Sequence, residues 1–172
     1  MADDINLGGR DEPVRGDDDH AELLSELDSH DLAIATTPDT DTGTKRFEYD
    51  PDADPDTVFP QSVASGGPTP TGVILWTRIA PAAFDATALL AVRVARDSDF
   101  EEVVYEGVVA DAEQIKSHDY TVKVDLDGSL ESDREYYYRF YYRNTASRIG
   151  RCQTLPAPDA SPEVMRFAVL AC

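Results

Sequence analysis

The sequence predicts an all-β fold, a sandwich of two sheets with about seven strands. Between residues 58 and 155, apolar and polar side chains alternate in short runs, the pattern of strands buried on one face. Gly, Pro and Asp separate these runs at the spacing of sandwich turns. The two cysteines, Cys152 and Cys172, do not pair the second predicted strand with the sixth. An immunoglobulin-like sandwich of the fibronectin type III kind is therefore expected, rather than an antibody-type domain.

Each predicted strand depends on this alternation. The seven predicted strands span residues 58–63, 73–79, 89–95, 103–109, 120–126, 135–143 and 148–154. In four of them one face is clearly apolar or aromatic, and those faces comprise Val73, Leu75, Thr77 and Ile79; Leu90, Val92 and Val94; Tyr120, Val122, Val124 and Leu126; and Tyr136, Tyr138, Phe140 and Tyr142. Residues 65–72 are predicted to form a turn-rich loop, in which the pair Gly66 and Gly67 supplies positive φ.

Two aromatic residues sharpen the prediction. Trp76 lies in the middle of the second predicted strand, where a sandwich needs a large side chain between its sheets. Tyr136 follows Leu130 by six residues, at the corner before the sixth strand. A tyrosine there can turn its hydroxyl back to the upstream backbone, as in the tyrosine corner of sandwich domains.

The predicted domains are an extension over residues 1–57, the sandwich over 58–155 and a linker with one strand over 156–172. The extension is acidic and partly disordered, with a short helix over residues 20–34 and a linker over 36–43. Phe47 and Tyr49 are expected to form an edge strand or a docking contact. Residues 166–172 are nearly all apolar, as in a strand buried on both faces of an α/β sheet, and we expect that strand to begin a domain missing from this sequence.

The net charge of −19 excludes a general binder of nucleic acids or anionic membranes, because phosphates would be repelled. Asp and Glu are concentrated in the first 58 residues, and only three of the basic residues are lysine. We interpret this bias as that of a halophilic protein; the other interpretation is an acidic tail that binds cations or a partner. No apolar run is long enough to span a bilayer. The start has no export signal, so the expected location is the cytoplasm unless the start codon is misassigned.

From the residues alone, no catalytic or metal site emerges. His20, His30 and His118 are not clustered at zinc-site spacing, and Cys152 is expected to be a small core residue. The acidic run at residues 17–19 lacks the ligand spacing of an EF-hand. Gly66 and Gly67 precede a proline and no Lys-Ser/Thr pair, so they do not form a phosphate-binding loop.

Residues 59–70 (FPQSVASGGPTP) and 72–81 (GVILWTRIAP) resemble the N-terminal domain of alkaline phosphatase D, or PhoD-like, enzymes. Residues 120–126, 136–140, 150–151 with 154–158, and 166–172 follow the same family order. The resemblance covers residues 58–172, and it departs at Gly67, where the family usually has Asp, and at Ala171, where it has Ser.

The resemblance implies a metal-dependent phosphomonoesterase and phosphodiesterase, exported in most relatives, in which a small sandwich precedes a metallophosphoesterase domain that binds iron and calcium. It implies that Cys172 is a ligand of the ferric ion in the full-length enzyme only. The catalytic domain, the expected partner, is missing, so the isolated chain is expected to be inactive and structural. The alternative is a stand-alone binding module that uses an exposed strand edge or the aromatic face of Tyr137 and Tyr141.

Overall fold

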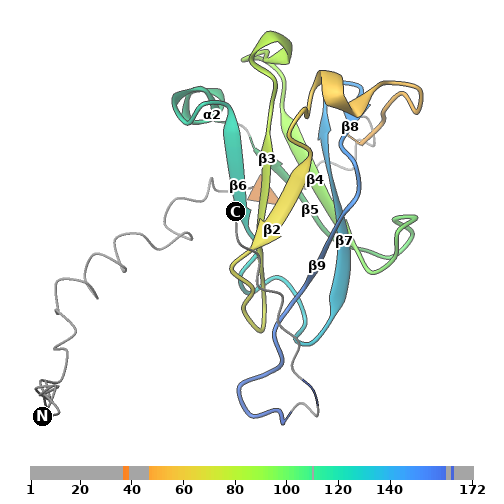
Figure 1. Ribbon diagram of the computed structural model, residues 1–172, viewed down its shortest axis with the longest axis vertical. Helices are drawn as coiled ribbons and strands as arrows, with labels where there is room; N and C mark the ends of the chain where they lie inside the picture. Colours follow the sequence, from red (N-terminus) through yellow and green to blue (C-terminus); the bar gives the residue numbers. More distant parts are fainter. Residues whose placement is uncertain (1–36, 39–46, 110, 162–163, 165–172) are drawn as a thin grey trace, which may run out of the picture.

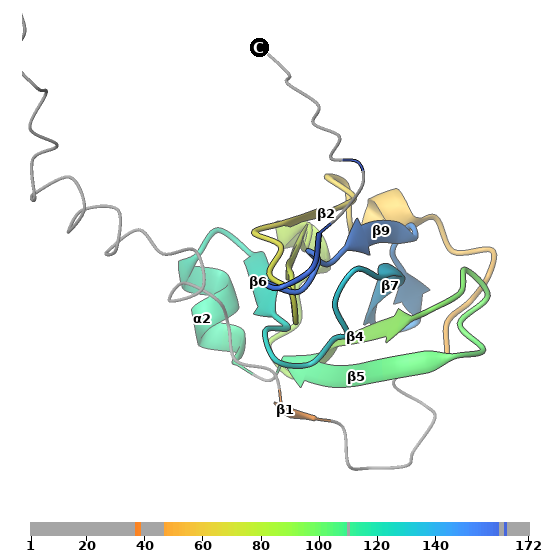
Figure 2. The same cartoon turned by 90° about the horizontal axis from the view of Figure 1, so that it is seen from below.

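Two antiparallel sheets stack face to face and enclose one apolar core (Figure 1). The computed structural model describes residues 37–38, 47–109, 111–161 and 164. One sheet has the strand order β1-β5-β4-β7-β8, with β9 also paired to β7, and the other has the order β2-β3-β6. The all-β sandwich that the alternation predicts is therefore confirmed. The view in Figure 2 shows β2 and β6 to the left of β7 and above β5.

The elements are short and joined by turns. The strands are β1 (Thr37–Pro38), β2 (Val63–Gly66), β3 (Ile74–Arg78), β4 (Leu90–Ala95), β5 (Val103–Val109), β6 (Thr121–Asp125), β7 (Glu135–Tyr142), β8 (Thr145–Ala146) and β9 (Gly150–Gln153). The helical turns are η2 (Pro55–Thr57), η3 (Pro81–Ala83) and α2 (Ala112–Ser117). Among the described helices, none is long and apolar enough to cross a membrane.

The core is formed by the alternating faces that the sequence predicts. Side chains on the inner face of β4, β6 and β7 are at most 1% exposed. Those residues are Leu90, Val92 and Val94; Val122 and Val124; and Tyr136, Tyr138, Phe140 and Tyr142. The register fixes this arrangement, because β4 and β7 pair from Leu90 with Tyr142 to Ala95 with Tyr137, and a slip of one residue would turn every side chain to the other face.

The prediction of a first strand over residues 58–63 is wrong. Pro55 instead opens η2, which Asp54 caps by accepting a hydrogen bond from the Asp56 amide at 3.0 Å. The turn continues through Phe59, whose amide donates to the Pro55 carbonyl at 2.7 Å. Phe59 is fully buried in the core from this turn. The strand starts only at Val63 and extends to Gly66, into residues predicted to be a loop.

Two further elements differ from the sequence prediction. Thr37 and Pro38, in the predicted linker, pair with β5 as a two-residue edge strand, where a proline is tolerated. Sequence reasoning also did not predict α2, a six-residue helix before β6. Asp111 caps it by accepting from the Gln114 amide at 2.8 Å, and Ile115 anchors it in the core. The helix predicted over residues 20–34 lies outside the described residues, as does the strand predicted over 166–172.

The prediction that Trp76 fills the space between the sheets is wrong. The inner face of β3 and its flanks is formed by Val73, Leu75, Thr77 and Ile79, each at most 1% exposed. Trp76 alternates with them and lies half-buried on the outer face. The inner face accepts a threonine because the Thr77 hydroxyl donates to the Ser62 carbonyl at 3.0 Å, which satisfies its buried polar group.

The predicted tyrosine corner is confirmed. The buried Tyr136 hydroxyl accepts a hydrogen bond from the Glu131 amide at 2.9 Å. Tyr142, at the other end of β7, plays a similar part: its hydroxyl accepts from the Asp85 amide at 2.8 Å and donates to the Asp85 carbonyl at 2.7 Å. Both ends of β7 therefore tie a loop to the core.

Removal of the Tyr136 hydroxyl tests the corner. Tyr136→Phe leaves the Glu131 amide without its partner, so we expect the free energy of unfolding to fall by about 1–3 kcal/mol. Urea denaturation of the purified chain measures it. Tyr137→Phe is the matched control, because its hydroxyl donates to Glu135 on the exposed face of the same strand, where loss is small. Equal losses in the two variants would contradict the assignment.

Trp76→Ala and Phe59→Ala test which aromatic residue supports the core. Phe59 is fully buried, so its truncation should cost about 3–5 kcal/mol of unfolding free energy. Trp76 is half-buried on the outer face, so its truncation should cost clearly less. If the same denaturation showed a larger loss for Trp76→Ala than for Phe59→Ala, Trp76 would have to lie between the sheets after all.

Candidate functional site

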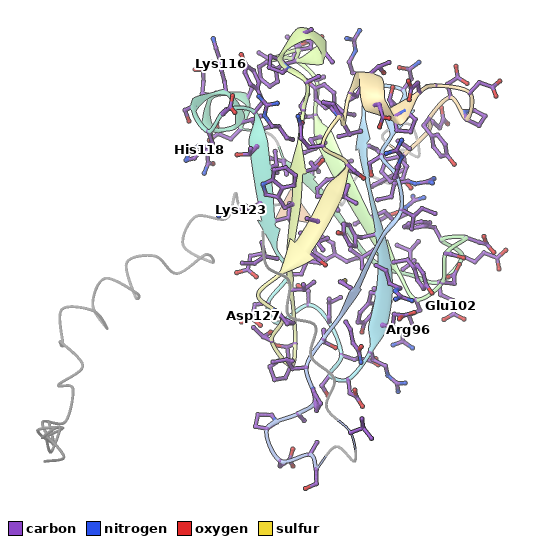
Figure 3. The ribbon with its side chains drawn as sticks, viewed as in Figure 1. Arg96, Glu102, Lys116, His118, Lys123 and Asp127 are labelled. Carbon is purple, nitrogen blue, oxygen red and sulfur yellow. The ribbon has the colours of Figure 1, made fainter. Side chains whose placement is uncertain are left out.

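The residues considered for metal binding or catalysis are not brought together in the described part of the chain. Cys172, His20 and His30 lie outside it. His118 is exposed at the end of α2, where its Nδ1 lies 2.8 Å from the Gln114 carbonyl oxygen and 3.1 Å from the Ser117 hydroxyl. Figure 3 shows it with Lys116 beside β6. Its hydrogen bonds are local to the helix.

Cys152 is a core residue, as predicted. It lies on β9 opposite Tyr136 and is 7% exposed. Burial, together with the charge of Glu135, raises the pKa of its thiol from 9.0 to about 12. A thiolate is the form that binds metals and attacks electrophiles, so Cys152 remains a protonated thiol at neutral pH.

Carboxylates of the described loops cap turns. Asp97 accepts hydrogen bonds from the amides of Glu102 at 2.7 Å and Glu101 at 3.0 Å, which lowers the pKa of Asp97 below its usual value. Figure 3 shows Glu102 and Arg96 at this β4–β5 loop. Among the residues the structure describes, no group of three or more His, Cys, Asp or Glu side chains could hold a metal ion. The iron and calcium implied by the resemblance do not fit these residues.

An apolar hollow lies on the outer face of β2 and β3. Its volume is about 270 Å³. It is lined by Ala64, Ser65, Gly66, Gly67, Ile74, Trp76 and Lys123. We call it the Trp76 hollow. It was not predicted, because the sequence analysis assigned Trp76 to the core.

Strand pairing explains the hollow. Ala64 lies opposite Trp76, and Gly66 lies opposite Ile74, so two small residues of β2 face two large residues of β3. The mismatch in size leaves space above β2. Of the two glycines predicted to supply positive φ, Gly67 does so, at 53°, and ends the strand beside the hollow, whereas Gly66 does not.

Polar groups border the Trp76 hollow on the side of β6. Lys123 pairs across the sheet with Trp76 and lies at the edge of the molecule (Figure 3). Within the described residues Lys123 forms no ion pair. Arg78 lies two residues after Trp76 on the same face of β3. Its guanidinium donates to the Asp119 carbonyl at 2.9 Å and pairs with the Asp119 carboxylate at 3.1 Å. The border therefore places the positive charge of Lys123 next to an indole ring.

The outer face of the other sheet is covered by residues from the extension. Phe47 packs edge-on against Tyr141, with ring centroids 5.4 Å apart, and the Arg93 guanidinium lies 4.1 Å from the centre of the Phe47 ring. Arg139 donates to the Tyr49 hydroxyl at 3.0 Å. Phe47 and Tyr49 thus make the docking contact that was one of their two predicted roles. Tyr141 is buried beneath them, so the predicted binding face of Tyr137 and Tyr141 does not exist as such.

Comparison with known proteins agrees with the resemblance. The family model for the PhoD-like phosphatase N-terminal domain matches residues 44–156. The chain belongs to the PhoD-like phosphatase family. The match begins before Phe47 and ends just after β9, so it includes the docked segment and every described strand except β1.

Two relatives show how much of a PhoD-like protein is present. Alkaline phosphatase D of Bacillus subtilis (strain 168) is 37% identical to this chain over an alignment of 120 residues. The match covers 66% of this chain and 20% of the relative. A solved structure of PhoD is 35% identical, with a TM-score of 0.55, and the match covers 62% of this chain and 21% of that one. The chain therefore spans about a fifth of the length of these PhoD-like proteins.

The reactivity of Cys152 tests its burial. In a Cys172→Ser variant, Cys152 is the single thiol, and we expect it to react with an aromatic disulfide reagent at pH 8 only after denaturation. The raised pKa also sets a direction for stability: above pH 9 the unfolded chain releases the proton that the folded chain keeps, so the free energy of unfolding should fall toward pH 12. Fast labelling of the native variant would contradict the buried position.

Proposed function

We propose that the chain serves as the N-terminal domain of an alkaline phosphatase D-type, metal-dependent phosphomonoesterase and phosphodiesterase, without catalysis of its own. The observation that carries the proposal is the extent of the match. The model of an N-terminal domain ends at residue 156, and the relatives are about five times longer than the matched part. The catalytic metallophosphoesterase domain is the partner that this proposal assigns.

The chemistry of the described side chains supports a structural role. The Cys152 thiol is buried and protonated, and tyrosine hydroxyls at both ends of β7 hold loops in place. Asp127 accepts from the Thr69 and Thr71 hydroxyls at 2.6 and 2.9 Å, which joins two loops at one end of the sandwich. These polar groups are engaged in holding the scaffold.

The domain boundaries and the metal ligand belong to the same proposal. We propose a sandwich over residues 58–155, preceded by an acidic extension and followed by residues 156–172 as a linker and the first strand of the catalytic domain. Cys172 is proposed as an iron ligand in the full-length enzyme only, on the resemblance alone. A stand-alone binding module is less well supported, because Tyr141 of its proposed aromatic face is buried.

An activity assay tests the non-catalytic role. The purified chain, supplied with ferric and calcium ions, should hydrolyse neither p-nitrophenyl phosphate nor bis(p-nitrophenyl) phosphate above a protein-free control. Alkaline phosphatase D of B. subtilis, assayed beside it, is the positive control. Turnover that co-elutes with the chain through two different columns would contradict the proposal.

A further inference from the structure

Among the described residues, the Trp76 hollow stays open on the outer face of β2 and β3. Trp76, the single tryptophan of the chain, is half-buried on an outer face, above an apolar space. Large aromatic side chains are costly to leave in contact with water and are enriched at protein interfaces. A second surface covering the hollow would remove this exposed apolar area.

Gly66 gives an independent argument. A Cβ at Gly72 would lie 2.4 Å from the Asp127 backbone, and one at Gly150 would lie 2.2 Å from the Tyr138 ring, so internal packing requires glycine at both positions. At Gly66 a Cβ would meet nothing within 4 Å, and φ is not in the left-handed region. The fold described here leaves room for a side chain at Gly66.

The path of the backbone places the end of the domain near the hollow. The Leu155 amide donates to the Thr69 carbonyl at 2.9 Å, so the segment after β9 lies beside the loop that follows Gly66 and Gly67. The family match ends at residue 156. In relatives that extend beyond the matched domain, the continuing chain therefore starts close to the Trp76 hollow.

We propose that the Trp76 hollow is the docking site for the catalytic part of a PhoD-like phosphatase, which inserts an apolar side chain between Trp76 and Gly66. The positive charge of Lys123 suits an acidic group on the same partner surface. This inference rests on the proposed function, and it adds the surface through which the domain acts. An apolar anchor in a dry pocket with a charge at the rim is the usual composition of an interface hot spot.

A binding experiment with a single spectroscopic probe tests the docking site. The whole 172-residue chain is labelled with 5-fluorotryptophan, which gives one ¹⁹F resonance because the chain has one tryptophan. The probe partner is B. subtilis alkaline phosphatase D without its matched fifth, after its cooperative thermal unfolding has shown that this part folds on its own. We expect sedimentation to show a complex and the Trp76 resonance to shift when it forms.

Gly66→Leu separates docking from folding. The added side chain has free space in the isolated chain, so its thermal midpoint should stay near that of the unaltered chain. In the complex it would occupy the space of the inserted side chain, and affinity should fall by at least about tenfold. Ala86→Leu, at an exposed position in the loop between η3 and β4, is the matched control and should bind as the unaltered chain does.

The outcomes distinguish this inference from the proposed function. No complex with the unaltered chain would contradict the proposed function, and the docking site with it. A complex in which the ¹⁹F resonance stays in place and Gly66→Leu binds normally would overturn the docking site alone. Self-association of the free chain that Gly66→Leu abolishes would assign the hollow to a second copy and would also overturn the inference.

Discussion

The pleat of the β-strands is the constraint on which the rest of the structure depends. Side chains alternate between two faces, and a sandwich must bury one face of each sheet. The four inner aromatic residues of β7 and the aliphatic residues of β4 and β6 meet this demand at almost no exposure. Once Leu75 and Thr77 point inward, Trp76 must point outward. The Trp76 hollow is therefore a consequence of how the core of the domain is packed.

The polar chemistry of the chain follows the same division. Where loops leave the sandwich, carboxylates accept hydrogen bonds from backbone amides, and tyrosine hydroxyls form hydrogen bonds to the loop backbone. On the outer face of the larger sheet, Arg93 and Arg139 hold Phe47 and Tyr49 in place. On the outer face of the smaller sheet, no described residue covers the Trp76 hollow. One outer face is thus covered by the chain itself, and the other offers an anchoring point to a partner.

The sequence predicts the fold well wherever alternation is regular, as in β4, β6 and β7, and the tyrosine corner also follows from spacing. Trp76 shows the limit of this reasoning. Its size suggested the core, whereas Arg78 on the same face indicated the surface. The short helical elements η2 and α2 depend on capping, and they contain too few residues for a helical period of apolar side chains to be visible in the sequence. The Trp76 hollow depends on which residues of β2 and β3 lie opposite each other, and register across strands is not visible in a single sequence.

The central claim is that Trp76 lies on the outer face, beside an open hollow, rather than between the sheets. Acrylamide quenching of tryptophan fluorescence in the 172-residue chain tests it most directly, because the single indole reports on one position. We predict efficient quenching in the native chain, with an emission maximum at longer wavelength than that of a core tryptophan. Resistance to quenching until the chain is denatured, with blue-shifted native emission, would contradict it.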